Sequence, residues 1–175
     1  MVKRQLTWNG IGLFMVFFVF SLTASGIIQP VRAADSQGVC QKDLAVTMVH
    51  SSAAGLGGLF KNTTDEKKRI ELMRAFIDPI RFYPDKSGYF YIYNLDCLNL
   101  AHATQKDLQG KNLSNYKDSK GKFVIRELAS AAKKGGGFVE YYWIKPGTQK
   151  EEKKLGYVEP IPGTNYFIGT GIYLP

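Results

Sequence analysis

The sequence has few of the residues that hold metal ions or act as nucleophiles. It contains two cysteines and two histidines, and the spacings CxxC, HExxH and CxxCH do not occur. No metal site and no cofactor are therefore expected. General acid–base chemistry would have to use His102 with Glu140 or Glu159, and no serine or cysteine has an assigned base. These gaps argue against an enzyme.

Positive charge gathered on one element is also missing. The net charge is +8, and three of the basic residues, Lys3, Arg4 and Arg32, lie in the first 34 residues, which contain no acid. The remaining sequence has 20 basic and 15 acidic side chains, a difference of +5. Such a mild and scattered excess differs from the basic stripe of a nucleic-acid-binding protein, so nucleic acid is not an expected partner.

The N-terminus has the layout of a leader for export. Lys3 and Arg4 precede an uncharged run from Ile11 to Leu22, and a Val-Arg-Ala cleavage pattern follows. This layout predicts a secretory signal peptide over residues 1–34. The alternative is a retained N-terminal anchor, since the uncharged stretch is just long enough to span a bilayer. Both interpretations place residues 35–175 outside the cytoplasm, in the periplasm.

The rest of the chain has the composition and pattern of one α+β domain. Hydrophobic residues make up 45% of the sequence and aromatic residues 13%, which is enough for a packed core. Helical spacing, with a capping box at Thr63 and Glu66, is followed by stretches of period two. The expected elements are helices at 39–60 and 63–78, strands at 88–94 and 98–103, a loop with a short helical turn, a helix at 122–134, and strands at 137–145, 154–159 and 165–173.

Strand alternation sorts the side chains onto two faces of the expected sheet. One face carries tyrosines and Trp143, which suits a loop-covered cavity for a few heavy atoms. Gly169 and Gly171 share a face of the last strand with Phe167 and Tyr173, and glycines that face a pocket would leave room for a ligand. The other face is apolar and suits packing against the N-terminal helices; its expected members are Phe90, Ile92, Phe138 and Ile144.

Several motifs in this order resemble the bacterial single Cache domain, type 2. The motifs are GYFYIY, the Ala-His pair after the hairpin, LQGKNL, KDSKGK, GGGFVEYYW and IGTGIY, and the resemblance covers residues 40–174. It implies a PAS-like, five-stranded antiparallel sheet, with long N-terminal helix or helices on one face and a loop-plus-helix excursion covering the other. It also implies an extracytoplasmic sensor module of chemoreceptors and histidine kinases, and a homodimer through the N-terminal helix.

Two positions depart from the family pattern. Ala103 stands where proline usually follows the histidine, and Cys97 stands where the hairpin turn usually carries glycine. An exported domain allows a disulfide, and Cys40 and Cys97 are the candidates, with two unrelated thiols as the alternative. The substitution at Cys97 points to the same link.

An aromatic cavity with cations at its rim suits a small carboxylate, because hydroxyls, cations and imidazole bind the oxygens while rings cover the carbon atoms. Alternatives remain for several candidates: Tyr89 and Tyr157 as packing residues, His102 as a structural residue, and Arg81 paired with an aspartate. The candidate ligand-binding residues are Arg81, Tyr89, Tyr91, His102, Lys111, Tyr141, Trp143, Lys145 and Tyr157.

The sequence therefore predicts a stand-alone extracytoplasmic sensor-type domain, free or tethered at its N-terminus. Its expected ligand is a small organic acid or an amino acid. The domain would feed signal transduction or chemotaxis through a membrane-bound signalling protein. The alternative is a periplasmic interaction subunit of a membrane kinase, receptor or transporter, with no small ligand and an exposed apolar patch instead.

Overall fold

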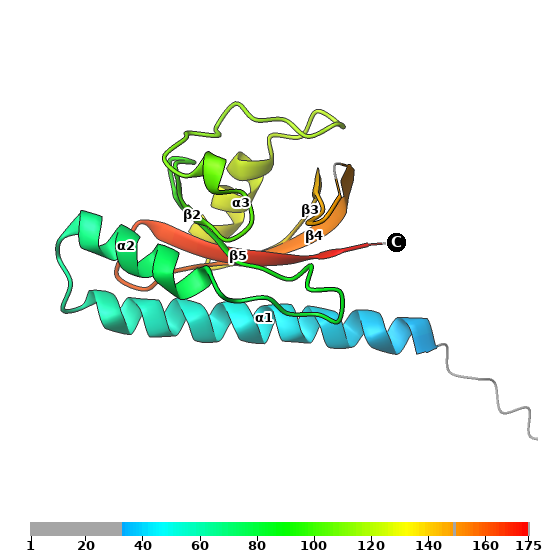
Figure 1. Cartoon of the computed structure of the whole chain (residues 1–175), viewed down its shortest axis with the longest axis horizontal. Coiled ribbons are helices and arrows are strands. Elements are labelled where there is room, and N and C mark those ends of the chain that lie inside the picture. The colour runs from blue at the N-terminus through cyan, green and yellow to red at the C-terminus, as the bar shows by residue number, and fades with distance from the viewer. Residues whose placement is uncertain (1–32, 149, 175) are drawn as a thin grey trace, which may run out of the picture. The chain divides into compact units, whose positions relative to one another are not determined.

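The computed structural model describes residues 33–148 and 150–174 (Figure 1). The predicted leader lies outside the described residues except for Ala33 and Ala34, which begin the first helix. None of the helices in the described ranges has both the length and the apolar character needed to cross a membrane. The elements in chain order are α1 (Ala33–Phe60), α2 (Glu66–Ile77), β1 (Tyr91–Asn94), β2 (Asn99–His102), a short 3-10 turn (Lys106–Leu108), α3 (Val124–Lys133), β3 (Gly137–Ile144), β4 (Glu151–Pro160) and β5 (Tyr166–Tyr173).

The strands form one antiparallel sheet in the order β2-β1-β5-β4-β3. Three hairpins join neighbours in the chain, and the pairing of β1 with β5 closes the centre of the sheet. The two strands that flank the α3 excursion in sequence, β2 and β3, are thus the two opposite edges of the sheet. The predicted α+β class and sheet are confirmed.

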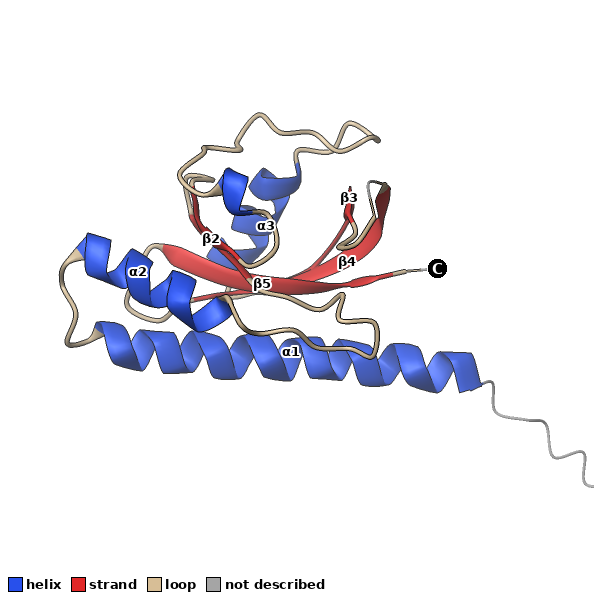
Figure 2. Ribbon diagram, in the orientation of Figure 1, coloured by secondary structure: helices blue, strands red, loops and turns tan. Residues whose placement is uncertain are grey.

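The long helix α1 lies along one face of this sheet, against β4 and β5 (Figure 2). Its buried residues recur at helical spacing, and the sheet meets them with apolar side chains such as Ile92 and Ile168, both fully buried. Close approach is possible because Gly57 has no side chain: a Cβ there would lie 3.0 Å from the ring of Pro162. The buried residues of α1 are Ala45, Val49, Ser52, Ala53, Leu56, Gly57 and Phe60.

Helix α2 begins later than expected. Asp65, not Thr63, is its N-cap, because the Asp65 carboxylate accepts the backbone N–H of Lys68 at 2.7 Å. The helix ends before Pro79, as the sequence predicts. Arg74 fixes α2 to the sheet, since its Nε donates to the carbonyl of Leu100 in β2 at 2.9 Å.

The opposite face of the sheet is covered by α3 and the loop that precedes it (Figure 2). The same loop protects the free edge of β3. The Asp118 carboxylate accepts the backbone N–H of Tyr142 at 3.0 Å, and the Lys122 ammonium donates to the carbonyl of Glu140. These contacts block the edge pairing that an open strand would invite.

Two expectations about packing are wrong. Phe90 and Ile92 are buried as predicted, but Phe138 and Ile144 are 41% and 36% exposed. Both residues lie on the edge strand β3, whereas α1 covers β4 and β5 and does not reach that far across the sheet.

Of the two alternatives for the cysteines, the structure has the unlinked one: Cys40 and Cys97 are both free thiols, and the candidate disulfide is not formed. Cys40 is exposed on α1, whereas Cys97 is buried in the β1–β2 turn within the electrostatic reach of Arg126 and Lys133 from α3, on the other side of the sheet. Cys97 has a φ of 68°, a left-handed conformation that glycine adopts at lower cost.

Candidate functional site

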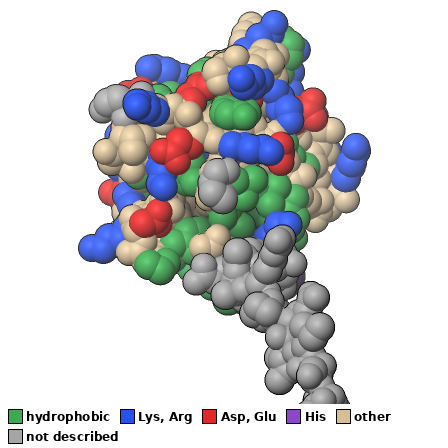
Figure 3. All heavy atoms as spheres, turned by 90° about the vertical axis from the view of Figure 1, so that its right-hand side faces the viewer, with side chains coloured by type: hydrophobic (Ala, Val, Ile, Leu, Met, Phe, Trp, Pro, Cys, Tyr) green, Lys and Arg blue, Asp and Glu red, His purple; other side chains and the backbone are tan. Residues whose placement is uncertain are grey.

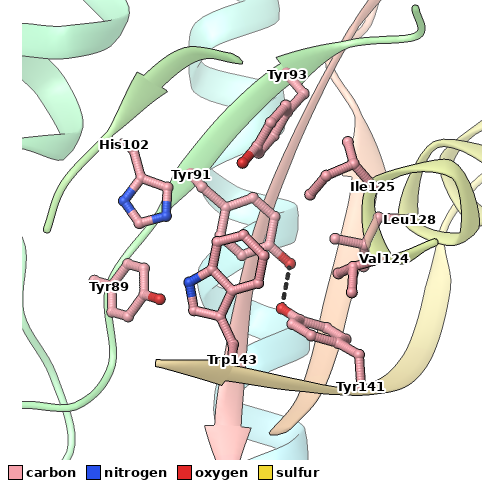
Figure 4. A pocket seen from close by; sticks show the side chains of 9 residues that line it. All are labelled: Tyr89, Tyr91, Tyr93, His102, Val124, Ile125, Leu128, Tyr141 and Trp143. Atoms are coloured by element: carbon pink, nitrogen blue, oxygen red, sulfur yellow. Dashed lines mark hydrogen bonds between the residues drawn. The ribbon is translucent and has the colours of Figure 1, made fainter. Parts of the chain in front are cut away.

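A small cavity lies between the sheet and α3 (Figure 4). Its walls come from β1 and the residue Tyr89 before it, from the two edge strands β2 and β3, and from the start of α3. The volume is about 10 Å³, which is room for about one water molecule. The lining residues are Tyr89, Tyr91, Tyr93, His102, Val124, Ile125, Leu128, Tyr141 and Trp143.

The cavity is smaller than the hollow for several heavy atoms that the sequence suggested. Its rings pack on one another: His102 stacks on Tyr91 and on Trp143, with ring centres 6.2 and 6.3 Å apart. The glycines do leave space on this face, but the space is filled by side chains. A Cβ on Gly169 would lie 2.7 Å from the Tyr91 ring, and a Cβ on Gly171 would lie 2.5 Å from Cε of Lys154.

Lys154 is the most unusual residue on this face. It is fully buried in β4, opposite Tyr141 of β3 and Tyr173 of β5. Its Nζ lies 4.0 Å from the ring centre of Tyr89 and 4.8 Å from that of Tyr173. Among residues 33–148 and 150–174, this Nζ has no hydrogen-bond partner.

The surroundings of Lys154 favour the arrival of an anion. Burial lowers the pKa of the Lys154 ammonium, although Tyr89 acts in the opposite direction. The faces of the tyrosine rings carry partial negative charge and offset part of the desolvation. Their attraction is weaker than that of a hydrogen-bonded carboxylate, so an anion beside Nζ would gain a charge-assisted bond in a dry environment.

His102 is a donor on the cavity wall itself, whereas Lys154 is buried behind the rings and is not one of the lining residues. Its Nδ1 accepts the backbone N–H of Gln105 at 3.0 Å, with the N–H of Thr104 at 3.4 Å. Burial, together with the charges of Lys154 and Arg81, lowers the pKa of His102 to about 3, so the ring is neutral at pH 7. Because Nδ1 accepts, the single proton of the neutral ring is on Nε2, which is therefore a hydrogen-bond donor.

The tyrosine hydroxyls form a short network around the same space. The hydroxyls of Tyr91 and Tyr141 lie 3.3 Å apart (Figure 4), and the Tyr91 hydroxyl also donates to the carbonyl of Thr170 at 3.3 Å. Burial raises the pKa of Tyr91 and Tyr141, so both are neutral phenols. Hydroxyls can donate or accept and therefore adapt to a ligand oxygen.

Tyr93 and Asn99 form a further polar pair at the far end of the cavity wall. They face each other across β1 and β2, and both are buried. In the described part of the chain, neither the Tyr93 hydroxyl nor the amide atoms of Asn99 has a hydrogen-bond partner. A buried water is the usual solution for such groups.

Five of the nine candidate residues meet around the cavity, and the structure brings them together from three strands and the segment before β1. They are Tyr89, Tyr91, His102, Tyr141 and Trp143. Their binding role stays a prediction.

Arg81 and Lys111 lie away from the cavity. Arg81 is exposed, and its guanidinium donates to backbone carbonyls, including that of Ala103 at 2.7 Å. This hydrogen bond links the segment after α2 to the end of β2. Lys111 is exposed and lies 3.9 Å from a carboxylate oxygen of Asp107.

Lys145 and Tyr157 are also not at the cavity. Lys145 is at the end of β3, where its Nζ lies 3.4 Å from Asp85 and 3.7 Å from Glu152. Tyr157 is on the α1 side of the sheet, where alternation along β4 places it, and its hydroxyl donates to Glu159 at 2.8 Å. Of the four candidate residues that lie away from the cavity, three therefore have an acidic partner: Lys111, Lys145 and Tyr157.

The sequence analysis missed Lys154, Tyr93 and Tyr173. A signal for Lys154 was present, because Lys154, Gly156 and Val158 alternate along the strand, so the lysine points the same way as two small or apolar residues. The predicted strand covers residues 154–159, which puts the lysine at the end of the strand, where side chains are commonly exposed. In the structure β4 begins at Glu151, which places Lys154 well inside the sheet.

The fold and this site define a sensor-type α+β domain, and comparisons with known proteins agree. A family model described as a Cache domain (dCache_2) matches residues 42–175. The chain therefore belongs to the Cache domain family. It is a Cache sensor domain of the kind found in chemoreceptors and histidine kinases.

Two curated relatives are signalling proteins by name. The sensor histidine kinase MctS of Rhizobium johnstonii is 39% identical over 114 residues, which are 65% of this chain and 24% of that protein. The methyl-accepting chemotaxis protein McpP of Pseudomonas putida is 25% identical over 150 residues, which are 85% of this chain and 26% of that protein. The chain thus spans about a quarter of the length of these relatives.

Two solved structures share the fold over most of their length. A methyl-accepting chemotaxis protein from Vibrio parahaemolyticus has a TM-score of 0.70 and 29% identity, with 82% of this chain and 95% of that chain covered. A Cache chemosensory domain described as a basis for carboxylic acid recognition has a TM-score of 0.69 and 26% identity, with 81% and 98% covered.

Proposed function

We propose that this Cache domain is an extracytoplasmic sensor module that binds a small carboxylate in the aromatic cavity. The ligand carboxylate receives hydrogen bonds from the Lys154 ammonium and from Nε2–H of His102, and the rings of Tyr89, Tyr91 and Trp143 cover its carbon atoms. The observation that carries the proposal is the fully buried Lys154 Nζ, which has no hydrogen-bond partner in the described residues.

The chemistry of the walls favours plain carboxylates over amino acids. No aspartate or glutamate is among the lining residues in the described part of the chain, so an α-ammonium group would be buried without a partner. The cavity of about 10 Å³ holds about one water molecule, so even the smallest carboxylate can enter only if the rings move apart, which favours short acids. The solved Cache domain described in terms of carboxylic acid recognition supports the same class.

A partner would carry the signal. The relatives named above are a histidine kinase and a chemotaxis receptor, and the chain spans about a quarter of each. We therefore propose that occupancy of the cavity is reported to a membrane-bound protein of this kind, in signal transduction or chemotaxis.

Two adjacent lysines provide a matched test. Lys154→Met removes the buried cation, whereas Lys153→Met removes a partly exposed one whose Nζ pairs with Glu140 at 2.9 Å. Isothermal titration with acetate, propionate and butyrate should show binding that Lys154→Met weakens by about 100-fold and Lys153→Met leaves within twofold. Glycine and alanine should bind more weakly than the acids of equal length. No heat from any of these acids with the wild-type protein would overturn the proposal.

A second candidate function is protein–protein contact without a small ligand. The exposed side chains of Phe138 and Ile144 on β3 favour it, and apolar side chains also gather at the centre of the face shown in Figure 3, with basic and acidic ones around them. The double variant Phe138→Ser with Ile144→Ser should abolish capture of a membrane partner under this reading. Under the carboxylate proposal it should leave titration with propionate unchanged.

A further inference from the structure

Gln105 is hydrogen-bonded to residues of both edge strands of the sheet. It follows β2 directly after the turn at residues 103–104 and precedes the short 3-10 turn. Its backbone N–H donates to Nδ1 of His102 at 3.0 Å, and its side-chain Oε1 accepts Nε1–H of Trp143 at 2.7 Å. Gln105 is thus bonded to two of the residues that line the cavity, although it does not line the cavity itself.

These two hydrogen bonds join parts of the sheet that share no ladder. His102 is on β2 and Trp143 is on β3, and these strands are the opposite edges of the five-stranded sheet. Three strands lie between these edges in the sheet. Because the sheet is twisted, His102 and Trp143 nevertheless line the same cavity (Figure 4). Gln105 closes this arrangement from the loop side.

Each bond of Gln105 fixes a property of the cavity. The backbone bond occupies Nδ1 of His102 and leaves Nε2 as the protonated nitrogen, so the imidazole is a donor. The side-chain bond satisfies the only polar atom of the Trp143 indole and holds its ring face against His102, at an interplanar angle of 23°. Without this acceptor, a largely buried N–H would have to turn toward another oxygen, including that of a ligand.

We infer that Gln105 is a positioning residue that sets the anion specificity of the cavity, by holding Trp143 as a ring wall and His102 as a hydrogen-bond donor. The inference rests on the proposed carboxylate site and names a residue outside its wall. Together with Lys154, the two fixed side chains present donors and apolar surface to a ligand. A carboxylate can use that set fully, whereas an amide or an amine cannot.

The test uses the full chain with Trp8→Phe, so that Trp143 is the single tryptophan. In this background Gln105→Leu keeps the backbone N–H and the side-chain size but removes the acceptor. Gln105→Glu keeps an acceptor for the indole but adds a negative charge beside the site. Two readouts are followed: solvent exchange of the indole Nε1–H by NMR, and affinity for propionate against propionamide by titration.

We expect Gln105→Leu to raise the exchange rate of the indole N–H about tenfold and to weaken propionate binding about tenfold. The ratio of the affinities for propionate and propionamide should also fall. Gln105→Glu should keep slow exchange, which shows rescue of the indole position, yet bind propionate at least as weakly because like charges repel. Gln109→Leu is the matched control, since the Gln109 side chain contacts the carbonyl of His102 at 3.5 Å and not Trp143.

Slow indole exchange and unchanged propionate affinity in Gln105→Leu would overturn the inference. The exchange readout needs no ligand, so it separates the two proposals. Fast exchange in Gln105→Leu combined with no propionate binding by the parent protein would remove the carboxylate function and the specificity role, and would leave Gln105 as a structural tie.

Discussion

The two faces of the sheet are built from different materials. On the side of α1, the buried residues are apolar, as in most protein cores; Ile92, Ile168, Val49 and Leu56 are examples. Toward α3, the same strands present phenols, an imidazole, an indole and one ammonium group, all buried. The first face gains stability from burial, whereas the second buries polar groups at a cost. The α1 face therefore supplies most of the stability, and the polar face under α3 is the place where we propose that the ligand binds.

The largest change in the free energy of unfolding is expected for a substitution on the α1 face. Ile168→Ala removes a fully buried side chain from β5 and leaves a cavity, so the free energy of unfolding should fall by about 3 kcal/mol. Urea denaturation followed by circular dichroism measures the loss. The affinity of the folded fraction for propionate should stay within twofold, and a selective loss of binding would break the division between the faces.

The second prediction tests the polar face through acid stability. The folded pKa of His102 is about 3 and the unfolded value is about 6.5, so the unfolded state takes up the proton first as the pH falls. The contribution of His102 is therefore fully present above pH 6.5 and falls by about 1.4 kcal/mol per pH unit below it, toward pH 3.

Replacing His102 by glutamine should flatten this part of the curve. Between pH 6.5 and 4.5, the free energy of unfolding of the wild-type protein should decline by about 2 kcal/mol more than that of His102→Gln. His50→Gln is the control, because the His50 side chain is 70% exposed on α1. Equal slopes for His102→Gln and the wild type would show that His102 is not buried as a neutral ring.

The smallest effect has the opposite sign from the first. Lys154→Met replaces a buried cation, which has no hydrogen-bond partner among the described residues, by an apolar side chain of similar length. Without ligand, the free energy of unfolding should rise by about 1–2 kcal/mol. Thermal and urea unfolding in carboxylate-free buffer measure the change, and Lys153→Met should shift it by less than about 0.5 kcal/mol. A marked destabilisation by Lys154→Met would mean that the ammonium group is already well satisfied.

Local patterns predicted most of the elements because their causes are local. Periodicity, proline and glycine located the helices and strands to within a few residues, and alternation put Tyr91, Tyr141 and Trp143 on one face. The N-cap of α2 was misplaced by two residues, since Thr63 and Asp65 are both good caps and only the packed chain selects between them.

The cations were harder to place because their partners are distant in sequence. Arg81 and Lys145 looked suitable for a ligand, but backbone carbonyls and carboxylates occupy them. The β3–β4 register puts Lys154 opposite Tyr141, and that register depends on where the hairpin begins. The position of the two cysteines was hard to predict for a similar reason, because only the folded chain exposes Cys40 on α1 and buries Cys97 in the β1–β2 turn.

The family, the order of the elements and the aromatic character of one sheet face can be predicted from the amino-acid sequence, since these follow from short-range pattern and composition. Only the tertiary structure decided which lysine is buried, which glutamine joins the two sheet edges, and how little space the rings leave between them. Burial and hydrogen-bond partnership depend on contacts between segments far apart in the chain, and a linear pattern does not contain those contacts.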